Sequence, residues 1–228
     1  MKIAILSAMQ EELTPILATL KNYTKEEFAK NNFYFANYCG KELVLAYSKI
    51  GKVNAALTAT LLIEKFGCQK LLFTGVAGAI KKELKIKDLI YASSLVQHDL
   101  DITAFGHPLG FVPGGAVFVK SSNELNKIAK NVAKDLDIKL DSGIVATGDQ
   151  FICNKDHKEK LSKMFGASAV EMEGASVAVV CDALKIPFFV LRSISDSSGD
   201  NAHIDFDAFL EESARISAKF ILNMVEHL

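Results

Sequence analysis

The stretch AVEMEGAS, residues 169–176, places two carboxylates, Glu171 and Glu173, among small and apolar residues. Carboxylates are rarely buried without a partner. The apolar run before them is typical of a buried strand, and the run from Glu173 to Leu184 is apolar nearly all round, which predicts a buried helix. Because residues two apart on an extended segment share a side, both acids are expected to face one site where a strand passes into a helix.

Short apolar runs alternate with helical patterns on both sides of this stretch. Strands are predicted at residues 2–8, 32–39, 41–48, 70–77, 88–99, 143–149, 167–172 and 187–196. Helices are predicted at residues 11–20, 51–66, 121–135, 154–164, 173–184 and from about 205 onward. Ser121 and Glu124 form a capping-box pattern that opens the third of these helices. The alternation predicts an α/β fold with a mixed sheet, as a single domain over residues 1–228.

The composition excludes several classes of protein. The chain of 228 residues is 50% hydrophobic, has a formal net charge of -1 and contains only two arginines, Arg192 and Arg215. A nucleic-acid partner or an anionic membrane is therefore not expected. The cysteines form no C-x-x-C pair, and TGVAG at residues 74–78 lacks the dinucleotide fingerprint and the phosphate-loop lysine, so neither a metal nor a cofactor is expected.

The apolar run at the N-terminus is too short for a signal peptide, and no apolar stretch is long enough to span a membrane. A core of this size does not need disulfides, which favours a reducing compartment. We therefore expect a cytoplasmic protein.

Acids follow several of the predicted strands at the ends where open α/β sheets bind their ligands. They are Glu11 and Glu12 after the first strand, Glu173 after the seventh and Asp196 after the eighth. Each has a structural alternative, because Glu12 and Glu173 could open helices and Asp196 could belong to a turn. Together they are the functional groups expected for hydrolysis of a glycosidic bond, in which one carboxylate activates water, another protonates the leaving group and a third binds sugar hydroxyls.

Residues 103–115, TAFGHPLGFVPGG, form an unusual segment that combines loop-forming glycines and prolines with large apolar side chains. An apolar loop usually covers a site of its own chain or of a partner subunit.

Several motifs, in order along almost the whole chain, identify a family resemblance. They are AMQEE, TGVAG, DITAFG followed by PGG, TGDQFI, AVEMEGAS, and RSISD followed by FDAFL. The chain resembles the 5′-methylthioadenosine/S-adenosylhomocysteine nucleosidases of the nucleoside phosphorylase superfamily. The resemblance implies a three-layer α/β/α domain around a mixed, partly barrel-like sheet, and a homodimer.

The resemblance also implies roles for the acids and their neighbours. Glu12 matches the residue that deprotonates the attacking water, and Asp196 matches the residue that protonates purine nitrogen 7. Glu173 matches the residue that binds the ribose 2′- and 3′-hydroxyls, with Met172 against the ribose. Because a free Asp is ionised at neutral pH, burial and neighbouring acids such as Glu12 would have to raise the pKa of Asp196.

The remaining substrate contacts implied by the resemblance fall into four groups. Glu171 and Arg192 match the surroundings of the water. Phe151 matches a ring that stacks on adenine, and Ile152 a backbone that pairs with its edge. Further contacts are expected from Met9, Ile50, Ala77, Gly78, Ser195 and Phe206 of the same subunit, and from Ile102, Phe105 and Pro113 of the second subunit. Val76 stands where the family often has a serine, which removes one polar contact to water or ribose.

The nucleophile has to be argued, because the same fold hosts phosphorylases. A carboxylate about 4 Å from a phosphate charge costs roughly 4 kcal/mol at an effective dielectric constant of about 20. Glu11 and Glu12 therefore favour water over phosphate. The alternatives are a purine nucleoside phosphorylase and a non-catalytic nucleoside-binding protein. The 5′ substituent of the nucleoside is left open among methylthio, homocysteinyl, plain deoxy and the larger group of 6-amino-6-deoxyfutalosine.

Overall fold

The computed structural model describes the backbone of residues 1–196 and 202–228, and the side chains of residues 1–196 and 208–228. Its strands are β1 (Lys2–Ser7), β2 (Thr24–Phe28), β3 (Asn31–Tyr38), β4 (Lys41–Tyr47), β5 (Lys70–Ala79), β6 (Leu89–Gln97), β7 (Val119–Lys120), β8 (Leu140–Thr147), β9 (Ala167–Glu171) and β10 (Phe188–Asp196). Its helices are α1 (Gln10–Leu20), α2 (Lys52–Thr60) with a π-helical continuation (Leu61–Lys65), a 3-10 turn (Thr103–Phe105), α3 (Asn123–Asp135), α4 (Lys155–Phe165), α5 (Gly174–Ala183) and α6 (Ala202–Glu226).

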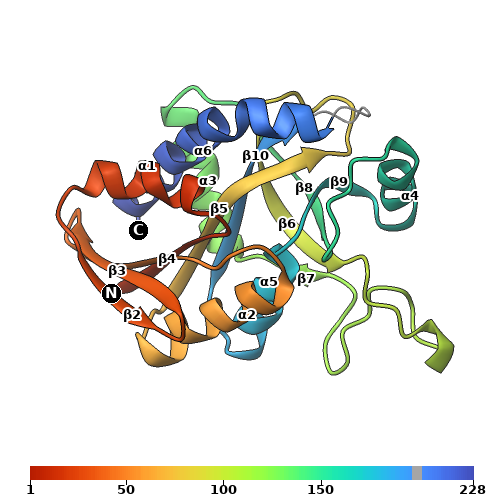
Figure 1. Cartoon of the computed structure of the whole chain (residues 1–228), viewed down its shortest axis with the longest axis horizontal. Coiled ribbons are helices and arrows are strands. Elements are labelled where there is room, and N and C mark those ends of the chain that lie inside the picture. The colour runs from red at the N-terminus through yellow and green to blue at the C-terminus, as the bar shows by residue number, and fades with distance from the viewer. Residues whose placement is uncertain (197–201) are drawn as a thin grey trace.

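In the described residues the strands form one sheet in which part closes on itself. The order is β10-β6-β8-β9-β5-β1-β4-β3-β2, and β10 also pairs with β5. The strands β10, β6, β8, β9 and β5 thus form a closed barrel, and β1, β4, β3 and β2 extend from β5 as an open sheet (Figure 1). Parallel pairs such as β1 with β5 occur beside antiparallel pairs such as β10 with β6, so the predicted mixed, partly barrel-like sheet is confirmed.

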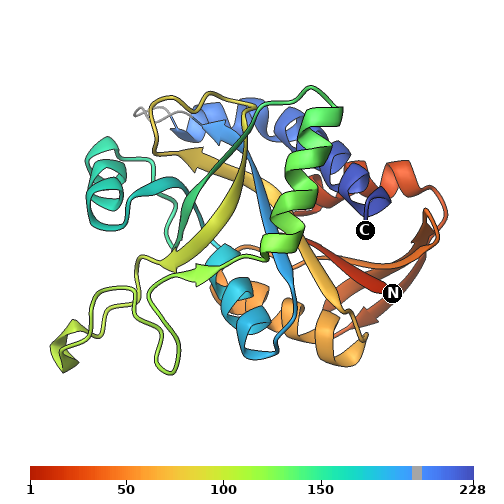
Figure 2. The ribbon, with the colours of Figure 1, turned by 180° about the vertical axis from the view of Figure 1, so that it is seen from behind.

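Helices cover the sheet on two sides. Leu13 of α1, Leu125 of α3 and Phe220 of α6 belong to one buried apolar cluster. Ala55 of α2 and Val177 of α5 belong to another, on the other side of the sheet. The three-layer α/β/α arrangement is therefore confirmed, and the two views of the ribbon show the two groups of helices apart (Figures 1 and 2).

Three details differ from the sequence-based expectation. The strand β2 was not expected, and its residues are all exposed, so no apolar alternation marks it. The cap of α3 is Ser122 and not Ser121, because the Ser122 side chain accepts a hydrogen bond from Leu125 N at 3.4 Å. Ser121 Oγ instead donates to the Ala92 carbonyl at 2.6 Å, so tertiary contact decides between two adjacent serines. The last helix begins at Ala202 and not near residue 205.

The segment of residues 103–115 leaves the body of the molecule as an extended projection (Figures 1 and 2). Phe105 on it is 81% exposed, which is unusual for a phenylalanine.

Candidate active site

A cavity of about 320 Å³ lies where β1, β5, β9 and β10 end. Parallel strands bring their carboxyl ends to one edge of a sheet, which is why residues far apart in the sequence meet there. Most of the residues predicted for the site line this cavity. The lining consists of Ala8, Met9, Glu12, Ile50, Val76, Ala77, Gly78, Phe151, Glu171, Met172, Glu173, Ser195 and Asp196.

Glu12 sits in the first turn of α1, and backbone donors from the β1–α1 connection and from β5 hold its carboxylate. Its Oε2 accepts from Ala8 N at 2.8 Å and Met9 N at 2.9 Å, and its Oε1 accepts from Val76 N at 2.9 Å. Burial raises the pKa of Glu12, although the charge of Arg192 and these donors oppose the shift. A pKa raised toward neutrality suits a general base. Glu11, expected beside it, is exposed on α1 and does not line the cavity.

Glu173 is the N-cap residue of α5, and its carboxyl points away from that helix to the start of α2. Its Oε1 accepts from Gly51 N at 2.8 Å. Burial and the charge of Glu171 raise the pKa of Glu173 to about 8. At pH 7 the carboxyl therefore carries its proton, so it can donate one hydrogen bond and accept another.

Glu171 lines the same cavity, but its oxygens already have protein donors. Arg192 Nη2 lies 2.6 Å from Oε2, Gly174 N donates to Oε2 at 2.7 Å, and Thr147 Oγ1 donates to Oε1. Arg192 is buried under the cavity and packs its guanidinium 4.1 Å from the centre of the Phe73 ring. The hydrogen bonds of Glu171 therefore connect β9 to β8, α5 and β10. Glu173 has fewer protein donors than Glu171 and is the acid of the pair with more capacity to bind a ligand.

Asp196 ends β10 after a β-bulge, which shifts the register with β5 between Ile194 and Asp196. Its Oδ1 accepts from Ser195 Oγ at 3.1 Å, and its Oδ2 lies 2.9 Å from the ammonium of Lys158 in α4. Both charged side chains are almost completely buried. Lys158 was missed by sequence reasoning, because it is one of several lysines in a helix that reads as solvated.

Two glycines of TGVAG explain how the acids approach the strand. A Cβ at Gly75 would lie 2.7 Å from Glu12 Oε1, and a Cβ at Gly78 would lie 2.7 Å from Asp196 Oδ2. Real Cβ atoms essentially never come so close to another atom. The motif therefore serves carboxylates here, through the same close approach that glycines give phosphates elsewhere.

Some predicted site residues lie outside the cavity lining. Ile152 is buried in a satellite apolar cluster, and Arg192 lies behind Glu171. Phe105 and Pro113 lie on the projecting segment and Ile102 directly precedes it, and none of the three lines the cavity of its own chain. The side chain of Phe206 lies outside the described residues.

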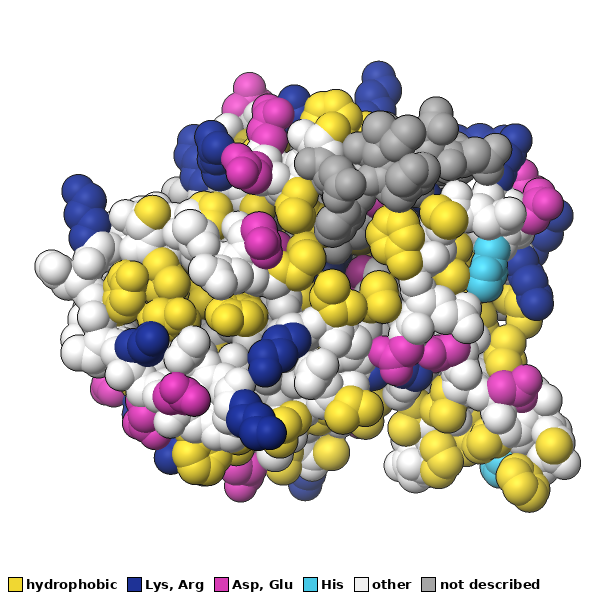
Figure 3. All heavy atoms as spheres, viewed as in Figure 1, with side chains coloured by type: hydrophobic (Ala, Val, Ile, Leu, Met, Phe, Trp, Pro, Cys, Tyr) yellow, Lys and Arg dark blue, Asp and Glu magenta, His cyan; other side chains and the backbone are white. Residues whose placement is uncertain are grey.

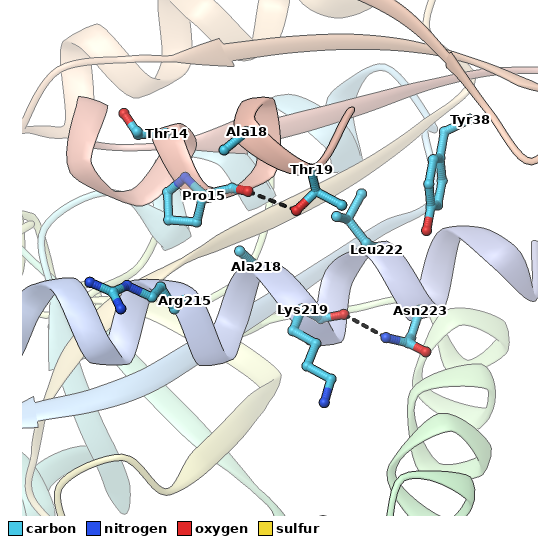
Figure 4. Close-up of a pocket in the computed structure, with 10 residues that line it drawn as sticks. All are labelled: Thr14, Pro15, Ala18, Thr19, Tyr38, Arg215, Ala218, Lys219, Leu222 and Asn223. Atoms are coloured by element: carbon cyan, nitrogen blue, oxygen red, sulfur yellow. Dashed lines mark hydrogen bonds between the residues drawn. The ribbon is translucent and has the colours of Figure 1, made fainter. Parts of the chain in front are cut away.

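A second cavity, of about 510 Å³, lies between α1 and α6 (Figure 4). Pro15 and Ala18 of α1 face Arg215 and Leu222 of α6 across it. Its lining contains no carboxylate, so it lacks the acids that the chemistry requires. The cavity at the strand ends is therefore the candidate active site.

Comparison with known proteins defines the class of this one. A sequence profile of the phosphorylase superfamily matches residues 2–226, and the chain belongs to that superfamily. Over its full length it is 63% identical to the aminodeoxyfutalosine nucleosidase of Campylobacter jejuni, with 100% of both chains covered. It is 36% identical over 230 residues to the 5′-methylthioadenosine/S-adenosylhomocysteine nucleosidase of Bacillus subtilis, again with 100% of both covered.

Solved structures agree. The futalosine hydrolase of Helicobacter pylori strain 26695 matches with a TM-score of 0.98 and 53% identity, covering 100% of this chain and 98% of that one. The 5′-methylthioadenosine/S-adenosyl homocysteine nucleosidase of Campylobacter jejuni matches with a TM-score of 0.96 and 63% identity, covering 100% of both. The protein is thus a nucleosidase of the phosphorylase superfamily, and the resemblance drawn from the sequence motifs is confirmed.

Proposed function

We propose that this protein hydrolyses the N-glycosidic bond of 5′-substituted adenosines and releases adenine and the 5′-substituted ribose. The proposed substrates are 6-amino-6-deoxyfutalosine, which the name of the Campylobacter jejuni relative suggests, 5′-methylthioadenosine and S-adenosylhomocysteine, which the name of the Bacillus subtilis relative suggests, and 5′-deoxyadenosine. The first of these would place the protein on a menaquinone route, and the second and third in methionine salvage.

The hydrogen bonds of Glu12 support water as the nucleophile. Backbone N–H groups that could cradle a phosphate dianion are those of Ala8, Met9 and Val76, and all three donate to the Glu12 carboxylate. A phosphate at this place would lose these donors and face a buried negative charge. A water molecule would instead find a general base.

The roles of the other residues follow from their positions. Glu173, with Met172 beside it, would bind the ribose hydroxyls, and it can both donate and accept because burial keeps it protonated at pH 7. As positive charge develops on the sugar, the electron-rich carboxyl oxygens of Glu173 would stabilise it. Asp196 would deliver a proton to purine nitrogen 7. Phe151, which is 48% exposed at the cavity, would stack on adenine.

A panel of 5′-substituted adenosines, compared by kcat/KM with free adenine as the readout, tests this function. Adenine release without added phosphate and a free sugar as co-product are expected. A strict phosphate requirement with a sugar 1-phosphate as product would show a phosphorylase, and ligand binding without any product would show a binding protein.

We also propose that the protein is a homodimer and works in the cytoplasm. The apolar side chains of Val53 and Leu57 on α2 and of Phe105 on the projecting segment are exposed. Figure 3 shows that apolar side chains gather on the projecting segment. A monomer would leave these side chains in water, whereas a partner could cover them.

All four cysteines lie in the described part of the chain and are free thiols, which fits a reducing compartment. No helix of the described residues is long and apolar enough to cross a membrane.

A further inference from the structure

The ion pair between Lys158 and Asp196 is buried at the site, and the mechanism above uses its acid but not its cation. Lys158 Nζ lies 2.9 Å from Asp196 Oδ2, with side-chain exposures of 2% and 3%. Lysine is almost never buried to this extent unless it is paired. Lys158 does not line the cavity, so it approaches the Asp196 carboxyl from the side of α4, behind the surface that a ligand would touch.

The pair poses a problem for a general acid. A neighbouring cation favours the ionised carboxylate, which has no proton to donate. The ammonium, however, does hold protons, and it lies within hydrogen-bond distance of the carboxylate. In a buried site the separated charges gain less from solvation than they do in water, so moving one proton from ammonium to carboxylate is easier there. The pair can therefore act as a single group with one proton to give.

Resting on the proposed function, we propose that Lys158 is a positioning residue that supplies, through the Asp196 carboxyl, the proton for the leaving adenine. The bond between the anomeric carbon and purine nitrogen 9 breaks, and its electron pair goes to the purine. Lys158 passes a proton to the Asp196 carboxylate, and the carboxyl so formed passes it to nitrogen 7, which leaves Asp196 as a carboxylate and Lys158 as a neutral amine. The water oxygen adds to the anomeric carbon and gives its proton to Glu12. Exchange with solvent returns one proton to Lys158 and removes one from Glu12, which balances the cycle.

Other charged groups share the surroundings of this pair. Glu12, Glu171 and Glu173 line the same cavity, and Arg192 is bound to Glu171. His157 precedes Lys158 on α4, and its ring lies 6.0 Å from that of His98. The side chains of residues 203, 205 and 207 lie outside the described residues. Variants at Lys158 leave all of these groups in place, so a comparison with the wild type isolates the lysine.

Lys158→Met is the primary test, because methionine keeps a flexible apolar stem of similar length and has no proton to give. The measurement is kcat against pH on 5′-methylthioadenosine and on p-nitrophenyl riboside, whose leaving group needs no proton. Without the ammonium the carboxyl alone must carry the proton, and a carboxyl loses its proton at lower pH than an ammonium does. The alkaline limb on the adenosine should move down by at least about one pH unit, with kcat at pH 8 at least about tenfold lower. KM and turnover of the p-nitrophenyl riboside should change by less than about threefold.

Lys158→Arg separates proton supply from charge. Arginine keeps a cation but does not release a proton, so it should not restore kcat on the adenosine. Restored kcat with Arg would overturn the proposal, as would an alkaline limb in Lys158→Met equal to that of the wild type. Equal losses on both substrates would also overturn it, because they would mean a structural role.

Turnover of the p-nitrophenyl riboside reports whether each variant has a folded site. If Lys158→Met or Lys158→Arg lacks this turnover and melts early, Lys158→Gln is measured in its place with the same two criteria. Failure of the proposed function itself would be recognised separately, because the wild type would then not release adenine without phosphate.

Discussion

Asp196 shows most clearly what a single residue contributes at this site. From the sequence, burial and neighbouring acids such as Glu12 were expected to keep it protonated. The structure places a cation, Lys158, at 2.9 Å from its Oδ2, which is the opposite charge from the one expected and is the basis of the proton relay proposed above. The need for an acid at this place is unchanged, because adenine is a poor leaving group as an anion.

Asp196→Asn tests that need. Asparagine keeps the size and a hydrogen bond but cannot donate a proton as an acid, and general acid catalysis is typically worth about 10²–10⁴-fold. We expect kcat on 5′-methylthioadenosine to fall by that order, with substrate binding changed far less. Turnover of p-nitrophenyl riboside is the control and should fall much less. An equal loss on both substrates, or nearly normal turnover of the adenosine, would reduce Asp196 to a structural residue.

Glu173 gives a prediction about stability and pH. Its pKa is raised from 4.5 to about 8, so between these pH values the folded state holds a proton that the unfolded chain has released. The free energy of unfolding should therefore decrease as pH rises through this window, by at most about 1.4 kcal/mol per pH unit. Glu173→Gln removes this contribution, and Glu12 titrates in both proteins.

Urea unfolding of the wild type and of Glu173→Gln at several values between pH 5 and pH 8 measures the effect. The variant should gain stability relative to the wild type as pH rises. Parallel pH profiles for the two proteins would show that the carboxyl of Glu173 ionises as freely as it does in the unfolded chain.

At the scale of elements, the start of α2 connects Glu173 in the cavity to the β8–α4 connection. Gly51 N donates to Glu173, and the next amide, Lys52 N, donates to Asp149 Oδ1 at 2.8 Å. The Lys52 ammonium lies 2.6 Å from Asp99, which in turn accepts from Asp149 N at 2.9 Å. Gly51 has a φ of 100°, which favours glycine, and a Cβ there would lie 3.1 Å from Asp149 Oδ1. Asp149 thus caps α2 from a distant loop.

Asp149→Ala should weaken this junction. Loss of a capping side chain costs about 0.5–2 kcal/mol, and the exposure of Asp149 places the expected loss near the lower value. Because Gly51 also orients Glu173, KM should rise as well. Asp149→Asn keeps an oxygen acceptor and is the matched control, which should recover most of both losses in urea unfolding and steady-state kinetics. Unchanged stability in the alanine variant would mean that water replaces the cap without cost.

At the scale of the whole molecule, closure of the barrel brings the ends of β5, β9 and β10 to one cavity, while the projecting segment extends away from it. The predicted contacts Ile102, Phe105 and Pro113 do not line the cavity of their own chain. If a second subunit binds against the projecting segment, these three residues come to lie beside the cavity of that second subunit. This is the arrangement that we propose for the homodimer.

Phe105→Ala tests this arrangement. Apolar contact remote from the reacting bond is mostly uniform binding, so the variant should raise KM more than it lowers kcat. Phe28, 41% exposed on β2, offers a matched control, and Phe28→Ala should leave KM unchanged. Light scattering should show a dimer for the wild type. A fully active monomer would contradict the proposal.

Several features could be derived from the sequence by itself. Periodicity marked most strands and helices, because burial of an apolar face is a local pattern. The motifs identified the family and the acids Glu12, Glu173 and Asp196, because the residue types at the strand ends can be read directly from the sequence. The strand β2 was not predicted, because exposed strands carry no apolar alternation. The choice between Ser121 and Ser122 as the cap of α3 depended on the contact of Ser121 with Ala92 in β6.

Only the tertiary structure decided what each acid meets. Glu171 and Glu173 are chemically identical and close in sequence, yet their partners differ. Glu171 forms an ion pair with Arg192, whereas Glu173 accepts a hydrogen bond from Gly51 N, 122 residues away in sequence. The partner of Asp196 is a lysine 38 residues away that resembles its solvated neighbours in every local respect. Such contacts arise when the barrel closes and α4 packs beside it, and because they join distant segments, no local pattern records them.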